Sequence, residues 1–227
     1  MGSSAAGPTV RAVVFDYGGV LTTPTRDSIN AWLTEERIRP ELFSAALKEW
    51  LSRHAPAGTP VHLLETGELD ADGFNKAMAA RLRTLDDEPV APDDLLGRLF
   101  ARMRPEPAML DLVRGLRERG IRTALLSNSW GNIDAYPWEQ LTGLFESTVL
   151  SGQVGLRKPD PSIYRMSLDE LGLPAEQTAF VDDGAPNVDA ARALGMHAVL
   201  HTGPAETRTR LAELLPTGSV PQDEETR

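Results

Sequence analysis

Four short polar clusters carry the chemistry that this sequence could perform. In the first, Asp16 follows the apolar run Val13-Val14-Phe15 and precedes two glycines, Gly18 and Gly19. A carboxylate held at a strand end beside a flexible turn can serve as a nucleophile or as a metal ligand. An aspartate after a strand is common, so the significance of Asp16 depends on the other three clusters.

The second and third clusters have groups that can bind a phosphate. Ser127 and Asn128 directly follow an apolar run, and a hydroxyl, an amide and free backbone N–H groups at a strand end can cradle an anion. The same residue types also favour helix N-caps. Lys158 precedes a helix start at Asp160-Pro161, where both the lysine and the helix N-terminus attract anions. A single loop lysine, however, is commonly just solvated.

The fourth cluster is the adjacent pair Asp182 and Asp183, which follows the apolar run 178–181. Neighbouring carboxylates repel each other unless a positive group compensates. Mg²⁺ prefers oxygen ligands and typically binds one or two carboxylates together with a substrate phosphate. A turn that caps the next helix is the alternative, and it explains one aspartate better than two.

The pattern of apolar runs predicts an α/β fold with a doubly wound parallel sheet. Strands are expected at 11–16, 121–126, 147–150, 178–181 and 196–200. Helices are expected around 109–116, 161–172, 186–194 and 207–215. Alternation of this kind covers both faces of a parallel sheet with helices. All four clusters would then converge at one edge of the sheet, where ligands bind.

The segment between the first two clusters has a different pattern. Apolar residues at helical spacing predict helices around 43–50, 74–82 and 95–100, and no strand is expected there. We therefore expect an α-helical cap at 23–103, inserted into a core made of 9–22 and 104–215. The ends, 1–8 and 216–227, are expected to be flexible tails.

Composition excludes several classes of protein. The 227 residues carry a formal net charge of −10, which argues against nucleic acid as the main partner. There is no cysteine, so neither a disulfide framework nor thiolate chemistry is available. No apolar run approaches the ~18 residues of a membrane span, and the N-terminus does not resemble a signal peptide. A cytoplasmic protein without a membrane partner is expected, and the sequence leaves open whether it is a monomer or a homodimer.

The four clusters together resemble the motifs of the haloacid dehalogenase-like hydrolase superfamily. These motifs are present here as Asp16-Tyr17-Gly18-Gly19-Val20, Ser127-Asn128, Lys158-Pro159 and Asp182-Asp183. The helical segment 23–103 is similar to the C1 cap of subfamily I. The stretches around the last three motifs are most similar to the N-terminal phosphatase domain of soluble epoxide hydrolase and to bacterial glucose-1-phosphate phosphatases.

The resemblance implies a Mg²⁺-dependent phosphatase that acts on a small phosphorylated metabolite. Asp16 would attack phosphorus and form an aspartyl-phosphate, while Ser127, Asn128, Gly18 and Gly19 would bind the phosphate. Lys158 would offset the negative charge. The Mg²⁺ ligands would be the Asp16 carboxylate, the Gly18 carbonyl and Asp183, with Asp182 as a nearer or outer partner.

Gly18 departs from this pattern, because phosphatases of the family usually carry there a second aspartate that protonates the leaving group. A glycine cannot do this, so a slower enzyme or one restricted to good leaving groups is expected. A catalytically silent scaffold on this fold is the main alternative. Cleavage of a carbon–halogen bond is disfavoured by Asp182-Asp183. Carbon–phosphorus cleavage is disfavoured because the only cap lysines, Lys48 and Lys76, lie in no recognisable motif.

Overall fold

The described part of the chain is built around a parallel sheet of five strands. The structure is a computed structural model that describes residues 10–51, 58–130 and 136–221. In spatial order the strands are β3 (Ser147–Leu150), β2 (Arg122–Ser127), β1 (Ala12–Phe15), β4 (Thr178–Asp182) and β5 (His197–Leu200). The order reverses beside β1, so residues that follow β1, β2 and β4 meet at one edge. The strands and the α/β class predicted from the sequence are confirmed.

Strand β1 forms the centre of the sheet because its side chains are apolar on both faces. Val13 and Phe15 pack into one hydrophobic core, and Ala12 and Val14 pack into another on the opposite face. All four residues are fully buried. A strand that is covered on both sides reads as a continuous apolar run, as this one does.

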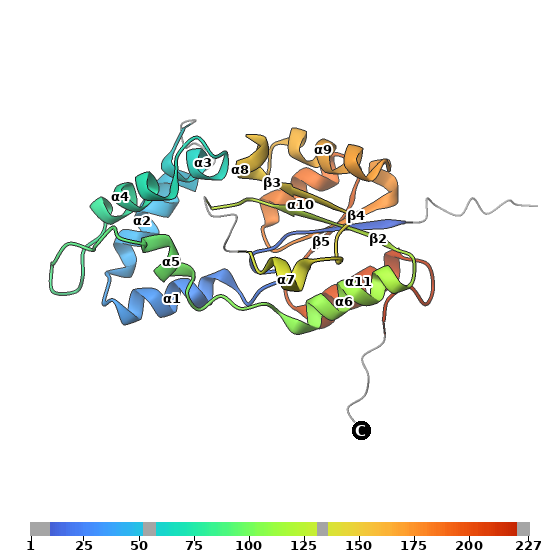
Figure 1. The fold of residues 1–227 in the computed structure, drawn as a ribbon, viewed down its shortest axis with the longest axis horizontal. Helices are drawn as coiled ribbons and strands as arrows, with labels where there is room; N and C mark the ends of the chain where they lie inside the picture. The colour runs from blue at the N-terminus through green and yellow to red at the C-terminus, as the bar shows by residue number, and fades with distance from the viewer. Residues whose placement is uncertain (1–9, 52–57, 131–135, 222–227) are drawn as a thin grey trace, which may run out of the picture.

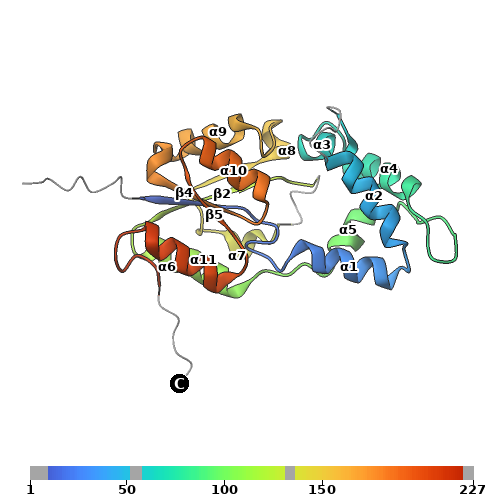
Figure 2. The ribbon, with the colours of Figure 1, turned by 180° about the vertical axis from the view of Figure 1, so that it is seen from behind.

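Helices cover both faces of the sheet, as Figures 1 and 2 show. One layer consists of α6 (Pro107–Glu118), α7 (Trp138–Leu141) and α11 (Pro204–Leu214). The other consists of α8 (Ser151–Val154), α9 (Pro161–Leu171) and α10 (Ala185–Ala193), and the 3₁₀ turn η2 (Ala175–Gln177) leads into β4. Helix α9 begins and ends where the sequence predicts, because Asp160 caps its N-terminus and Gly172 ends it at a φ of 58°.

Five helices form a second body beside the sheet (Figure 1). They are α1 (Thr25–Glu35), α2 (Pro40–Leu51), α3 (Pro60–Glu65), α4 (Ala71–Arg81) and α5 (Leu95–Phe100). They enclose a hydrophobic core of their own, with Trp32, Phe74 and Met78 at most 2% exposed. The predicted helices around 43–50, 74–82 and 95–100 are confirmed as α2, α4 and α5, whereas α1 and α3 were not predicted.

The two chain segments that join this cap to the sheet lie side by side. Thr22 and Pro105 form an isolated antiparallel bridge. The Thr23 amide donates to the Arg104 carbonyl, and the Glu106 amide donates to the Leu21 carbonyl. The entry and exit of the cap are therefore tied to each other.

Within the segment expected to be a flexible tail, residues 219–221 contact the rest of the molecule. Val220 is 8% exposed and packs into the core beneath α6 and α11. The Pro221 carbonyl accepts a hydrogen bond from Arg208. Residues 216–218 are exposed, so this packing is limited to the last described residues. Among the described residues, no helix is long and apolar enough to cross a lipid bilayer.

Candidate active site

Asp16 stands at the carboxyl end of β1, where the sheet order reverses. Its backbone amide donates to the Val181 carbonyl, which continues the pairing with β4 by one residue. Its carboxylate is 8% exposed and accepts a 2.7 Å hydrogen bond from the Tyr17 amide. The strand thus fixes the backbone of Asp16, while the next amide orients the carboxylate.

The two glycines after Asp16 are not equivalent. Gly19 has a φ of +77°, and a Cβ there would lie 2.4 Å from Asp183 Oδ2. Only glycine fits, because both the backbone conformation and the close carboxylate exclude a side chain. Gly18 lies outside the positive-φ region, and a Cβ there would meet Thr25 Oγ1 at an ordinary 3.5 Å. A Cβ at Gly18 would therefore meet no steric conflict.

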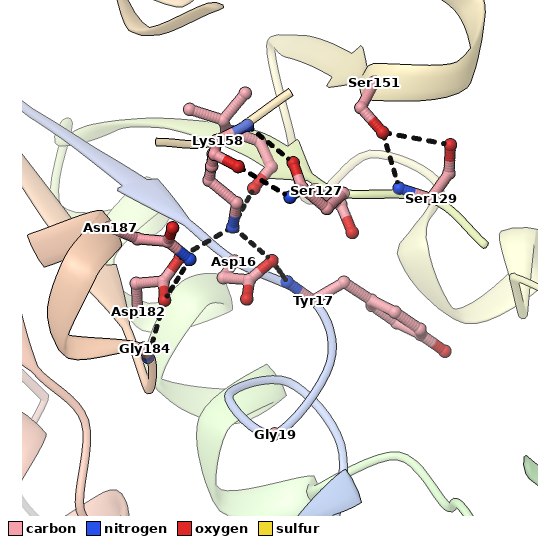
Figure 3. Close-up of polar contacts among 12 residues, drawn as sticks. Asp16, Tyr17, Gly19, Ser127, Ser129, Ser151, Lys158, Asp182, Gly184 and Asn187 are labelled. Atoms are coloured by element: carbon pink, nitrogen blue, oxygen red, sulfur yellow. Dashed lines mark hydrogen bonds and ion pairs between the residues drawn. The ribbon is translucent and has the colours of Figure 1, made fainter. Parts of the chain in front are cut away.

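Lys158 is the charged centre of the site (Figure 3). It is 1% exposed, and its Nζ lies 2.8 Å from Asp16 Oδ1 and 2.6 Å from Asp182 Oδ2. A third contact of 3.2 Å reaches the Leu126 carbonyl. The Asn128 side chain holds the lysine backbone at both ends, because Oδ1 accepts from the Lys158 amide and Nδ2 donates to the Lys158 carbonyl. The ammonium is therefore fixed between two carboxylates.

Asp182 and Asp183 are adjacent but lie in different surroundings. Asp182 is fully buried and accepts hydrogen bonds from the Gly184 amide at 2.7 Å and from Asn187 Nδ2 at 3.0 and 3.2 Å (Figure 3). Asp183 is exposed. One carboxylate oxygen from each of Asp16, Asp182 and Asp183 can be chosen so that all lie within 4.8 Å of one another. This cluster of hard oxygen atoms fits a divalent cation such as Mg²⁺.

The electrostatics of this cluster favour binding of a cation. Burial raises the pKa of Asp16 to about 7; Lys158 opposes the rise, and Asp182 and Asp183 add to it. Partial burial and the neighbouring Asp182 also raise the pKa of Asp183. Burial alone would lower the pKa of Lys158, but its two carboxylate partners together outweigh that effect and raise it. Lys158 thus stays protonated. Its single positive charge does not balance the three nearby carboxylates, which favours binding of a cation among them.

Ser127 ends β2, the strand next to β1, and is paired with a tyrosine. Its Oγ is 2% exposed and lies 2.9 Å from the Tyr136 hydroxyl. Burial raises the pKa of Tyr136, so the phenol stays protonated. The Tyr136 ring packs against Tyr17 at a centroid distance of 4.5 Å and stacks on Trp138 at 5.2 Å. This aromatic packing fixes the hydroxyl that contacts Ser127.

A cavity of about 430 Å³ opens between the sheet edge and the cap. Its lining residues are Asp16, Tyr17, Gly18, Thr25, Glu65, Leu96, Gly97, Phe100, Met103, Ser127, Asn128, Trp130, Tyr136, Lys158, Asp183 and Asn187. The sheet edge supplies the charged end, and the cap supplies most of the apolar end. Trp130 belongs to the loop after β2 but packs edge-on against the cap residues Phe74 and Phe100, at 5.8 and 5.5 Å.

The sequence is similar to those of known hydrolases and phosphatases. The profile of the family described as haloacid dehalogenase-like hydrolase matches residues 10–195. The chain belongs to this family. Bifunctional epoxide hydrolase 2 of Sus scrofa is 27% identical over 218 residues, which cover 90% of this chain and 38% of that protein. The D-ribitol-5-phosphate phosphatase of Bacteroides thetaiotaomicron is also 27% identical, over 91% of this chain and 98% of its own length.

A solved structure shows the same fold. A haloacid dehalogenase family enzyme of Bacteroides thetaiotaomicron, in complex with magnesium and inorganic phosphate, superposes with a TM-score of 0.60. It is 20% identical, and the match covers 84% of this chain and 93% of that one. The present chain spans only 38% of the pig epoxide hydrolase, so its relation to the activities of that longer protein is a matter for proposal.

This haloacid dehalogenase-like hydrolase brings the predicted site residues together, although not all of them face the cavity. The six that line it are Asp16, Gly18, Ser127, Asn128, Lys158 and Asp183. Asp182 lies behind Lys158 and is fully buried. Gly19, predicted to bind phosphate, does not line the cavity, and its amide donates to Thr22 Oγ1 at 2.9 Å. A side chain at Gly19 would collide with the Asp183 carboxylate.

Several lining residues of the cavity were not identified by the sequence analysis, and two of them bear polar groups beside the predicted site. Tyr136 is one, and only its aromatic type nine residues after Ser127 could have suggested it. Glu65 of the cap is the other; its carboxylate pairs with Arg157 and is 6% exposed. The Glu65 carbonyl accepts a hydrogen bond from Ser151 Oγ, which also receives the Ser129 amide at 2.8 Å. Cap and sheet are therefore joined beside the lysine loop.

Proposed function

We propose that this chain is a Mg²⁺-dependent phosphatase that hydrolyses a small phosphomonoester through an aspartyl-phosphate. The observation that carries the proposal is that Asp16 lines the cavity 2.8 Å from the buried ammonium of Lys158, and that Ser127 lines the same cavity. A carboxylate nucleophile that attacks an anion needs positive charge and hydrogen-bond donors near the phosphoryl oxygens. These residues can provide both.

The donor set supports Mg²⁺ as the cofactor. Asp16 and Asp183 border the cavity, whereas the oxygens of Asp182 already accept from Lys158, Gly184 and Asn187. We therefore assign direct binding of the ion to Asp16, Asp183 and the Gly18 carbonyl, with Asp182 behind them. When bound, Mg²⁺ would neutralise charge on the phosphate and on the carboxylates.

The chain's own residues would carry the reaction in two steps. A carboxylate oxygen of Asp16 bonds to phosphorus as the bond to the leaving oxygen breaks, and water then hydrolyses the aspartyl-phosphate. The Ser127 hydroxyl and the Asn128 backbone amide would hold the transferring oxygens. Lys158 offsets the charge that develops on them.

Gly18 limits which phosphates can react well. General acid catalysis contributes about 10²–10⁴-fold, and Gly18 has no side chain that could donate the proton. Esters whose leaving oxygen departs without protonation should be preferred. Gly18 also supports a second candidate function, a scaffold that binds phosphates without turning them over.

The Asp16→Asn variant tests the proposal. Phosphate release from 4-nitrophenyl phosphate would be measured with Mg²⁺ and with excess chelator. We expect turnover by the unmodified protein only with Mg²⁺, and none by Asp16→Asn, because an amide cannot attack phosphorus. Asp189→Asn is the matched control, since Asp189 is exposed and lies outside the cavity. Equal activity in Asp16→Asn would remove Asp16 from the mechanism, and binding of phosphate without any turnover would favour the silent scaffold.

A further inference from the structure

Part of the cavity lining is apolar. Helix α5 and the turn after it contribute Leu96, Phe100 and Met103, and the loop after β2 contributes Trp130. Phe100, Met103 and Trp130 are only partly buried, so each presents apolar surface to the cavity. Covering such surface with an apolar group is favourable in proportion to the area removed from water.

Three acidic or amide side chains of the lining, those of Glu65, Asn128 and Asn187, already have partners within the protein. The Glu65 carboxylate is paired with Arg157. Both ends of the Asn128 amide bind the backbone of Lys158, and the Asn187 amide nitrogen binds Asp182. These are the side-chain types that would normally recognise the hydroxyls of a sugar or polyol, as paired donors and acceptors.

The neutral polar groups that remain are few and scattered. Tyr136 is bonded to Ser127, which leaves the hydroxyls of Tyr17 and Thr25, the indole N–H of Trp130 and the amide oxygen of Asn187. A polyol in this chamber would lose water from several hydroxyls and regain few hydrogen bonds. A buried polar group left without a partner is strongly unfavourable, so a polyol should bind poorly.

We propose that the substrate of this site is a phosphate monoester of an apolar alcohol or phenol. Its phosphoryl group lies at Asp16 and Lys158, and its apolar group packs against Phe100, Met103 and Trp130. The inference rests on the proposed phosphatase function and specifies its substrate class. It does not depend on Gly18, because burial of the leaving group and protonation of its oxygen are separate effects.

Straight-chain alkyl phosphates from ethyl to hexyl separate these two effects. Their alcohols differ little in pKa, so any trend in kcat/KM along the series reports burial of methylene groups. If each added methylene group is completely buried, kcat/KM should rise roughly four-fold per methylene until the alkyl chain fills the cavity. We expect at least a ten-fold rise from ethyl to hexyl phosphate. Glycerol 3-phosphate and ribitol 5-phosphate, polar substrates of similar length, should react more slowly than the alkyl phosphates of equal chain length.

The variant Met103→Gln keeps the length of the side chain and makes its end polar. We expect it to flatten the chain-length dependence of kcat/KM, because a polar side-chain end no longer favours burial of the alkyl chain. Leu85→Gln is the control, because Leu85 is 55% exposed and lies outside the cavity. Phe100→Ala gives a second test, and its melting temperature would show whether the cap still folds.

The outcomes distinguish this inference from the proposed function. A steep rise with chain length that Met103→Gln or Phe100→Ala flattens supports the apolar chamber. A flat series, or faster hydrolysis of the polyol phosphates, overturns it while leaving the phosphatase function intact. Absence of turnover for every monoester, 4-nitrophenyl phosphate included, overturns both.

Discussion

Removing the charge of Asp16 should make the metal-free protein more stable at alkaline pH. The Asp16 carboxyl has its pKa raised from 3.8 to about 7, above all by burial, so the folded protein holds the proton more tightly than the unfolded chain does. As the pH rises from 4 to 7, the unfolded chain releases this proton first, and the free energy of unfolding falls. Above pH 7 the loss is complete.

The size of the effect follows from the two pKa values. One pKa unit corresponds to about 1.4 kcal/mol, so the difference of roughly three units makes the ionised carboxylate unfavourable by about 4 kcal/mol at pH 8. Asp16→Asn keeps the shape and loses the charge. In excess chelator its melting temperature at pH 8 should exceed that of the unmodified protein by roughly 10 °C, since 1 kcal/mol shifts a domain of this size by a few degrees.

The pH dependence makes this prediction specific. The difference in melting temperature between Asp16→Asn and the unmodified protein should shrink by more than half from pH 8 to pH 5, because at pH 5 the folded protein holds the proton on Asp16. Saturating Mg²⁺ should narrow the gap at pH 8, because it stabilises the unmodified protein by binding to its carboxylates. Thermal unfolding followed by circular dichroism measures these melting temperatures at pH 8, at pH 5 and with Mg²⁺. The control is Asp189→Asn, because Asp189 is exposed. A gap that is absent at pH 8, or equal at pH 5 and pH 8, would refute the reasoning.

Three further predictions concern neighbours of Asp16. Gly18→Asp should raise the rate with alkyl phosphates about 10²-fold through general acid catalysis, whereas Gly18→Asn should not; equal rates in a steady-state assay would contradict this. Gly19→Ala should weaken Mg²⁺ binding measured by calorimetry, because its Cβ would lie 2.4 Å from Asp183 Oδ2 and displace that carboxylate. An unchanged affinity would count against Asp183 as a Mg²⁺ ligand. Tyr136→Phe should lower kcat roughly five- to ten-fold, the value of one hydrogen bond, yet have no further effect in Ser127→Ala. An undiminished effect in the double variant would show that the tyrosine acts independently.

The sequence is most informative where local chemistry decides the structure. The apolar run before Asp16 and the cap-and-stop pair Asp160 and Gly172 predict β1 and α9, because burial and backbone preference act on the residues themselves. The convergence of the four clusters follows from parallel topology alone. It required no knowledge of side-chain contacts.

The contacts that the sequence could not predict depend on tertiary structure. Tyr136 meets Ser127 only because the chain after β2 returns to the sheet edge, and Glu65 meets Arg157 only because the cap docks there. Helix α3 is six residues long, too short to show a period, and it follows a turn-rich segment. Val220 packs into the core although its neighbours in the sequence are mostly polar, so the average composition of this segment does not predict its burial.

The position of Trp130 joins the mechanics of the cap to the chemistry of the sheet edge. This side chain belongs to the loop that starts at Ser127, yet it packs with Phe74 and Phe100 in the hydrophobic core of the cap. A rotation of the cap would pull on a loop anchored only two residues from Asn128. Thermodynamic linkage is reciprocal, so a phosphate held by that loop must in turn favour one cap orientation. If the loop binds a phosphate as proposed, Trp130 would couple occupancy of that site to the orientation of the cap.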